Sequence, residues 1–212
     1  MAPTTAPDAD TIPPLHSTKH RLIVAGLRLL LKHGYNDLGI QALLQATQTP
    51  KGSFYHHFKD KEDFALQVLN TYMTQVHAGM DACLKHPDRP PLTRVRDFFE
   101  MTQKSYREEG YMGCLIGGLG QELSGVNEVF RARIAQCFSE IAAGMASCLE
   151  EARQLGDIPK DSDVQEMAER LVDCWEGAAL RSRLQRDPNS LISMLDFYFS
   201  AVTGVRQQAD AS

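Results

Sequence analysis

Apolar residues recur every three or four positions along most of this chain, and that spacing is what most constrains its fold. In the first such segment, Leu22, Ile23, Leu27, Leu30 and Leu31 would share one face of a helix. No stretch of useful length alternates apolar and polar residues as a half-buried strand does. The pattern therefore predicts an all-α chain of about nine helices, with segments near 17–33, 40–46, 50–57, 61–85, 91–109, 127–155, 161–186 and 188–205 and a glycine-rich apolar stretch at 110–120.

Two short helices joined by a tight turn follow the first helix, an order typical of a helix-turn-helix. Thr49 is expected to cap the third helix, with Pro50 in its first turn, where a missing N–H costs little. Phe54 and Phe58 are four residues apart and would anchor one face in the core. The opposite face is left mostly to polar and aromatic residues: Lys51, Ser53, Tyr55, His56 and His57. For Tyr55, partial packing in the core is the alternative.

Charge is distributed unevenly along the chain. Its formal net charge is −5, yet residues 17–61 contain seven Lys/Arg and only two acidic residues. The basic side chains are Lys19, Arg21, Arg28, Lys32, Lys51, Lys59 and Lys61. A small basic segment on an acidic body suits a protein that meets phosphate groups at one end only.

The run from Pro50 to Glu62, which reads PKGSFYHHFKDKE, closely resembles the signature of the TetR/AcrR family of transcriptional regulators. This resemblance implies a three-helix DNA-binding head, a long connecting helix and a helical ligand-binding body that dimerises through its last two helices. It divides the chain into a helix-turn-helix domain at 17–61 and a sensor and dimerisation domain at 62–205. The proline-rich residues 1–16 and residues 206–212 are expected to be a disordered tail and a flexible C-terminus.

The family also implies roles for matching positions. Lys51 and His56 would contact base edges, whereas Ser53, Tyr55 and Lys61 would contact phosphates. Gln41 and Thr49 are further candidate contacts at the helix starts, and Gly52 would allow close approach to the DNA backbone. The sequence departs from the family at Leu38-Gly39-Ile40, where many members have a capping Thr or Ser.

A second resemblance lies in the body. Residues 113–123 (GCLIGGLGQEL) and 175–183 (WEGAALRSR) look like the NemR/AcuR branch of the family, whose members respond to reactive electrophiles or small unsaturated carboxylates. A cysteine at the Cys114 position is implicated in some of them. Cys114 follows Gly113 near a helix start, where the helix dipole would lower the pKa of the thiol. A pocket-lining or inert packing role for Cys114 is the alternative.

Other residues complete the predicted body. Tyr111, Met112, Trp175 and Arg181 are candidate neighbours of Cys114 in a ligand pocket. The other four cysteines lie in apolar helical patterns and are expected in the core. A dimer surface is predicted from the apolar residues of the last two helices, with closure of the intramolecular core as the alternative: Leu171, Trp175, Ala178, Ala179, Leu191, Leu195, Phe197, Tyr198 and Val202.

These features predict a dimeric repressor that binds a palindromic double-stranded DNA operator and is released by a small electrophile or ligand. An activator, or a repressor with a purely reversible inducer, is the alternative. The sequence contains no nucleophile elbow, phosphate loop or HExxH motif, so we expect no enzyme activity and no cofactor. No cysteine pair has zinc spacing, and no apolar run is long enough for a membrane span, so we expect no metal and a cytoplasmic protein.

Overall fold

The computed structural model describes residues 17–203 and places nine α-helices and no strand among them, which confirms the predicted all-α class. The predicted tails at 1–16 and 206–212 lie outside the described residues. In chain order the helices are α1 (Thr18–His33), α2 (Ile40–Thr47), α3 (Lys51–His57), α4 (Lys61–Leu84), α5 (Pro91–Glu108), α6 (Leu115–Leu123), α7 (Glu128–Leu155), α8 (Val164–Gln185) and α9 (Asn189–Val202).

Local sequence signals explain several helix boundaries. The side chain of Asp60 accepts a hydrogen bond from the backbone N–H of Asp63 at 2.8 Å and so caps α4. Gly34 ends α1 with φ at +77°, a conformation that favours glycine, and its N–H donates to the carbonyl of Leu30. Gly156 ends α7 in the left-handed helical conformation, at φ +85°.

The predicted cap of α3 is wrong by one residue. Pro50, with ψ at 146°, is itself the N-cap, so α3 begins at Lys51. Thr49 is buried, and its hydroxyl donates to the carbonyl of Thr47 at 3.3 Å instead of capping the helix. The fixed φ of proline suits an extended residue as well as a helical one, so Pro50 can precede the helix instead of opening it.

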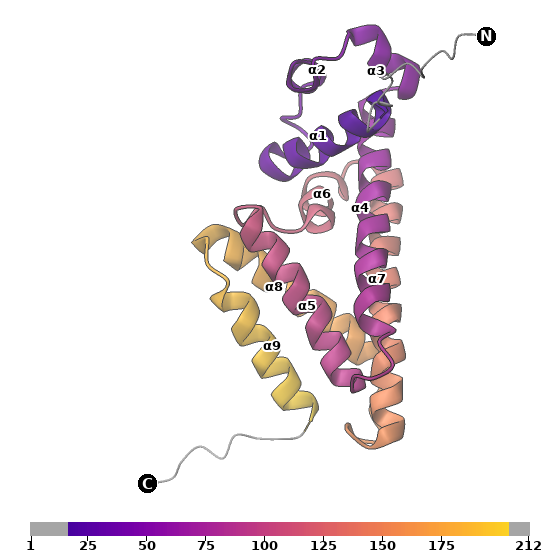
Figure 1. Cartoon of the computed structure of the whole chain (residues 1–212), viewed down its shortest axis with the longest axis vertical. Coiled ribbons are helices and arrows are strands. Elements are labelled where there is room, and N and C mark those ends of the chain that lie inside the picture. Colours follow the sequence, from indigo (N-terminus) through magenta and orange to yellow (C-terminus); the bar gives the residue numbers. More distant parts are fainter. Residues whose placement is uncertain (1–16, 204–212) are drawn as a thin grey trace, which may run out of the picture.

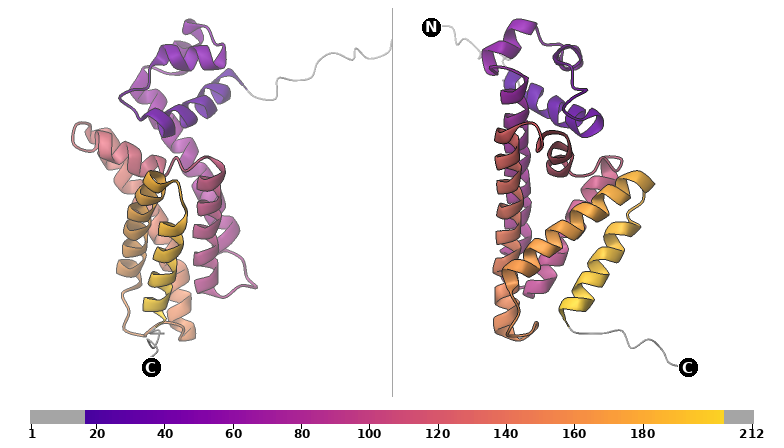
Figure 2. Two further views of the ribbon diagram at one scale, coloured as in Figure 1. Left: turned by 90° about the vertical axis from the view of Figure 1, so that its left-hand side faces the viewer. Right: turned by 180° about the vertical axis from the view of Figure 1, so that it is seen from behind.

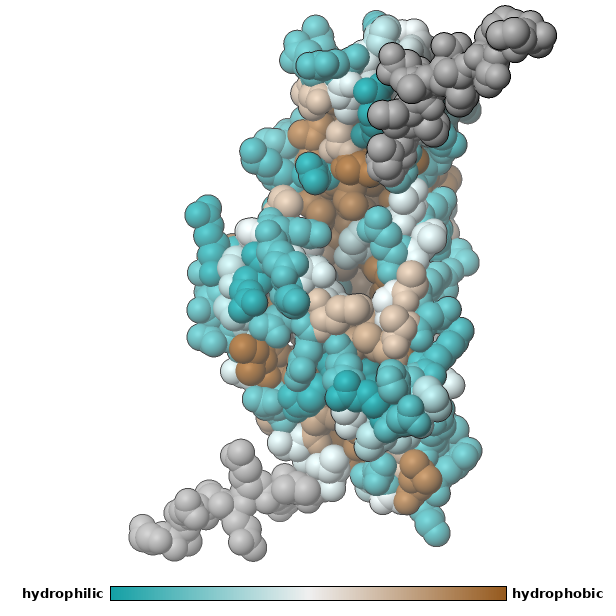
Figure 3. Space-filling view, viewed as in Figure 1, coloured by the Kyte–Doolittle hydropathy of each residue, from teal (hydrophilic) through white to brown (hydrophobic). Residues whose placement is uncertain are grey.

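Helices α1, α2 and α3 form a head (residues 17–61) at one end of the molecule, and the remaining helices form the body below it (Figure 1). Phe54 of α3 and Phe58, the residue after α3, pack against Phe64 of α4, with ring centroids 5.4 and 4.9 Å away, so the third helix is anchored on the connecting helix. Figure 2 shows α4 running beside α7 along the body, with α8 and α9 adjacent on another side. On the face in Figure 3, apolar side chains gather along a hollow below the head.

Besides its packing on α4, the head contacts the body at the end of α6. The carboxylate of Glu122 accepts hydrogen bonds from the backbone N–H groups of Tyr35 and Asn36, each at 2.9 Å. A Cβ at Gly34 would lie 2.2 Å from Oε1 of Glu122, so the close approach requires glycine there. From α8, Arg183 donates to the carbonyl of Leu31 at 3.3 Å. Glu122 thus links the end of α6 to the loop between α1 and α2 through two hydrogen bonds.

Within residues 17–203, no helix is both long and apolar enough to cross a membrane. The same range contains no group of three His, Cys, Asp or Glu side chains placed to hold a metal ion.

Candidate functional site

The outer face of α3 is polar and open to solvent. Lys51, Gly52, Tyr55 and His56 are exposed, and Ser53 is partly buried. A Cβ placed on Gly52 would meet nothing within 4 Å, so the backbone there is open to a close-lying partner. Tyr55 is 50% exposed and its ring contacts Phe54 edge-on at 5.2 Å between centroids, so it packs partly on the core and presents the rest of its surface to a partner. A groove beside this face runs between α2 and α3 and is lined in part by Gln41, Lys51 and Tyr55.

Two of the predicted DNA contacts have other partners in the structure. The side chain of Thr49 is only 6% exposed and faces its own turn, so it presents little surface to a partner. Lys61 donates to the carbonyl of Asn36 at 3.3 Å, and its ammonium lies 4.6 Å from the ring centroid of Tyr35. Partial burial lowers the pKa of Lys61. Its contact with phosphate stays a prediction, but the structure gives it a role in fixing the loop between α1 and α2.

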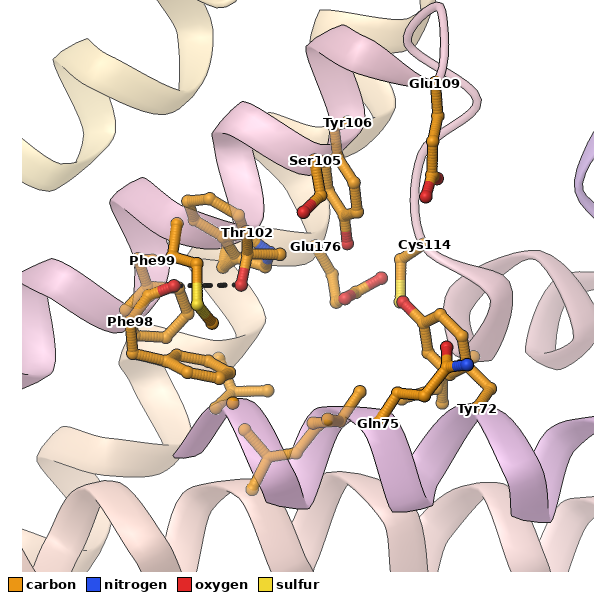
Figure 4. A pocket seen from close by; sticks show the side chains of 17 residues that line it. Tyr72, Gln75, Phe98, Phe99, Thr102, Ser105, Tyr106, Glu109, Cys114 and Glu176 are labelled. Carbon is orange, nitrogen blue, oxygen red and sulfur yellow. Dashed lines mark hydrogen bonds between the residues drawn. The ribbon is translucent and has the colours of Figure 1, made fainter. Parts of the chain in front are cut away.

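A cavity of about 170 Å³ lies in the body between α4, α5 and α8, below the first turn of α6 (Figure 4). One wall is aromatic: Trp175 packs on Phe99 and Tyr106, with ring centroids 4.7 and 6.1 Å apart. The side chains around the cavity come from all these helices and from Ile141 of α7: Tyr72, Gln75, Val76, Gly79, Phe98, Phe99, Met101, Thr102, Ser105, Tyr106, Glu109, Cys114, Ile116, Ile141, Val172, Trp175 and Glu176.

Glu176 and Cys114 meet at the edge of this cavity. Burial raises the pKa of the Glu176 carboxyl from 4.5 to about 7, and a hydrogen bond with the Cys114 thiol offsets part of that rise. The carboxyl also lies close to α6, because a Cβ on Gly117 would be 2.3 Å from Oε2 of Glu176. In Figure 4 the Glu176 side chain reaches into the space between Tyr106 and Cys114.

The predicted lowering of the Cys114 pKa is wrong. Burial raises the pKa of this thiol well above its ordinary value, and the neighbouring Glu176 carboxylate raises it further. Cys114 is the N-cap of α6, and hydrogen bonds from the backbone of Gly117 and Ile116 do lower its pKa. Those N–H groups are outweighed because the thiolate would be buried beside a carboxylate.

The structure places only part of the predicted sensing set in the cavity wall. Cys114 and Trp175 line it, but Tyr111 and Met112, on the loop after α5, do not. Arg181 is exposed on α8 rather than directed into the cavity. Sequence reasoning missed Tyr72, Gln75 and Tyr106, which lie on otherwise apolar helix faces, and Glu176, whose only signal was an acidic residue next to a buried tryptophan.

The predicted dimer residues are mostly interior. Of the nine, only Phe197 is strongly exposed, at 77%, while Tyr198 is partly buried and donates its hydroxyl to the carbonyl of Met167. The other seven are buried within one chain, as the core-closing alternative expected. Apolar side chains that remain exposed on α8 and α9 are Leu180, Leu184, Ile192 and Phe197. The prediction that all four other cysteines lie in the core is wrong for two of them, since Cys174 is exposed and Cys83 is only partly buried.

Known proteins resemble this chain along most of its length. Residues 22–68 match the family described as bacterial regulatory proteins, tetR family, and residues 91–196 match the tetracyclin repressor-like C-terminal domain. The transcriptional regulator AcuR of Cereibacter sphaeroides is 36% identical over 193 residues, which cover 90% of this chain and 85% of AcuR. The transcriptional repressor NemR of Escherichia coli K12 is 26% identical over 172 residues, which cover 81% of this chain and 86% of NemR.

Two solved structures extend the similarity to three dimensions. The regulatory protein TetR from Rhodobacter sphaeroides has a TM-score of 0.83 at 34% identity and covers 86% of this chain and 98% of its own. The reduced form of Escherichia coli NemR has a TM-score of 0.78 at 26% identity and covers 86% of this chain and 95% of its own.

Proposed function

Because the chain belongs to the TetR family of bacterial transcriptional regulators, we propose that it is a repressor that binds a two-fold symmetric DNA operator as a dimer and releases it when a small molecule enters the body cavity. One observation supports this above all. Helix α6 contacts both the cavity and the head, since Cys114 and Ile116 at its start line the cavity and Glu122 near its end binds the head.

Repression is favoured over activation by the relatives, because NemR is named as a repressor. The exposed apolar side chains of α8 and α9 are the surface on which we place the dimer contact, with Phe197 and Leu184 the most exposed of them. A two-fold dimer would present two copies of α3 to a roughly palindromic site.

A ligand shifts such an equilibrium only through its different affinity for the DNA-binding and released states. In the structure described here, the first turn of α6 closes one side of the cavity. An occupant larger than the empty space would move α6, and Glu122 would pull on Tyr35 and Asn36 in the loop between α1 and α2. This movement would change the spacing of the two recognition helices in the dimer.

The proposed function is tested by selecting binding sites from a random pool of double-stranded DNA with the purified protein. We expect enrichment of one sequence with two-fold symmetry, bound with an affinity that falls steeply as salt rises. A promoter assay with that site placed across the start of transcription then separates repression from activation. A pool that shows no enriched sequence contradicts the proposal.

Replacing Lys51 by alanine is expected to weaken operator binding by about 1–3 kcal/mol, because its exposed ammonium at the start of α3 would contact a base edge. Preference at one base pair of each half-site should relax at the same time. Titration of labelled operator measures both effects. The matched control is Lys160→Ala, which removes an equally exposed lysine from the turn between α7 and α8. Equal losses in the two variants would contradict the placement of α3 on DNA.

Two kinds of inducer fit this cavity. A reversible ligand is favoured by the raised pKa of Cys114, which leaves little reactive thiolate at neutral pH. A covalent electrophile is the second candidate, because Cys114 lines the same cavity and any electrophile bound there would meet its sulfur.

The rate of Cys114 alkylation separates these candidates. At pH 7 we expect Cys114 in the folded protein to react with N-ethylmaleimide at least about tenfold more slowly than glutathione, because its raised pKa lowers the thiolate fraction. Mass spectrometry of tryptic peptides at timed intervals gives the rate. The same cysteine in urea should approach the rate of glutathione. Faster labelling in the folded protein than in urea would instead support the electrophile sensor.

A further inference from the structure

We propose that the body cavity binds a small organic cation, such as an amine or a quaternary ammonium compound, with the Glu176 carboxylate as its counter-ion. This inference rests on the proposed ligand-sensing role of the cavity and specifies the chemical class of the ligand.

The charges around the cavity favour a cation. Its described lining contains two carboxylates, Glu109 at the exposed rim and Glu176 inside, and no Lys, Arg or His. Arg183 lies near Glu176 in an adjacent small cavity, but it donates to the backbone carbonyl of Leu31. Arg28 acts on Glu109 at the rim. Above pH 7, where Glu176 is mostly ionised, an anionic ligand would therefore be buried beside a carboxylate without a partner of opposite charge, which is costly.

The walls supply the second half of a cation site. Five aromatic side chains line the cavity, namely Tyr72, Phe98, Phe99, Tyr106 and Trp175. Aromatic faces attract an ammonium group, most strongly when it is desolvated and when the ring is a tryptophan. In Figure 4 the side chains of Tyr72 on α4 and Tyr106 on α5 lie on two sides of the Glu176 carboxyl, and a side-chain hydrogen bond from Tyr106 acts on Tyr72. A cation held there would touch both rings and the carboxylate.

Glu176 also lacks a strong partner within the protein. The Cys114 thiol is the hydrogen-bonding group that acts on its carboxyl, and a thiol is a weak donor. A purely apolar ligand would leave this carboxyl buried with that one weak bond. A cation would neutralise it, so the cavity binds a cation more tightly than a neutral molecule of the same shape.

Binding should depend on pH near neutrality. Without ligand, the Glu176 carboxyl has a pKa of about 7, so at pH 7 it carries a proton in a fraction of the protein molecules. A cation that binds to those molecules must displace this proton. The groups that face Glu176 from the packed helices are Cys114, Tyr72 and Tyr106, and burial raises the pKa of each, so all three stay neutral between pH 6 and 8. Glu176 is thus the group in the cavity interior that titrates there.

The test uses calorimetric titration of the full chain with choline, with its uncharged isostere 3,3-dimethyl-1-butanol, and with the anion 3,3-dimethylbutanoate. We expect choline to bind at least about tenfold more tightly than either, and about tenfold more weakly at pH 6 than at pH 8. Glu176→Gln should abolish the preference for the charged compound, whereas the matched Glu109→Gln at the rim should keep most of it. Melting curves of both variants verify that they fold.

Equal binding of choline and its isostere, tighter binding of the anion, or no binding of choline at 10 mM would each overturn the inference. Operator binding without ligand is measured on the same samples. Sequence-specific DNA binding without a choline effect refutes the ligand class alone. Choline binding by a protein that selects no DNA sequence refutes the proposed function and leaves the cation site standing.

Discussion

Replacing Phe54 by alanine is expected to destabilise the protein by about 3–5 kcal/mol and to abolish operator binding. The side chain is fully buried, and its ring lies 5.2 Å from Phe58 and 5.4 Å from Phe64 between centroids. These three rings hold α3 on the connecting helix, so the cavity left by alanine would release the recognition helix. Because a domain is stable by only about 5–15 kcal/mol in total, this is a large share. Urea unfolding followed by circular dichroism measures the loss.

The neighbouring residue is the matched control. Tyr55 follows Phe54 on the same helix but is 50% exposed, whereas Phe54 is fully buried. Tyr55→Ala should lower the free energy of unfolding by less than about 1 kcal/mol, as surface substitutions usually do, while still weakening DNA binding. A pair of variants with equal loss of stability would contradict the separation of α3 into an anchoring and an exposed face.

The head illustrates what a sequence can predict. Local rules determine most of it: the four-residue spacing of Phe54 and Phe58, the Asp60 cap and the Gly34 stop depend on neighbours within one turn of helix. The family resemblance, including its NemR/AcuR branch, is confirmed by similarity over 90% of the chain to AcuR. The local error at Thr49 arose because the fixed φ of proline suits both a first helical residue and an extended residue before the helix, and the sequence does not determine the ψ of Pro50.

The cavity illustrates what a sequence hides. Cys114 was placed correctly at a helix start, but its pKa depends on Glu176, 62 positions further along the chain, and on burial that only the packed helices create. Tyr72 and Tyr106 resemble ordinary core positions until α4 and α5 are seen to leave a space between them. Most residues predicted for the dimer surface are buried within one chain for a related reason, since apolar periodicity on α8 and α9 marks burial without saying against which chain.

Glu176→Gln is expected to make the protein more stable at pH 8 while leaving its stability near pH 5 little changed. The folded protein binds the Glu176 proton more tightly than the unfolded chain, because the pKa rises from 4.5 to about 7 on folding. The stability linked to this proton is therefore complete below pH 4.5 and is lost as the pH rises through 7. The total loss is on the order of 3 kcal/mol, and glutamine, which does not ionise, avoids it.

Urea unfolding of both proteins at half-unit intervals between pH 5 and 8 gives their free energies of unfolding. The value for Glu176→Gln minus that for the unsubstituted protein should rise with pH and level off above 7. Glu169→Gln is the matched control, because it makes the same exchange on the same helix at an exposed position, where Glu169 accepts a hydrogen bond from Gln165. Its difference curve should stay flat. A flat curve for Glu176→Gln would mean that water reaches this carboxyl and holds its pKa near the ordinary value. Saturating choline should reduce the loss of stability that the unsubstituted protein shows as the pH rises, because a bound cation stabilises the carboxylate that folding otherwise penalises.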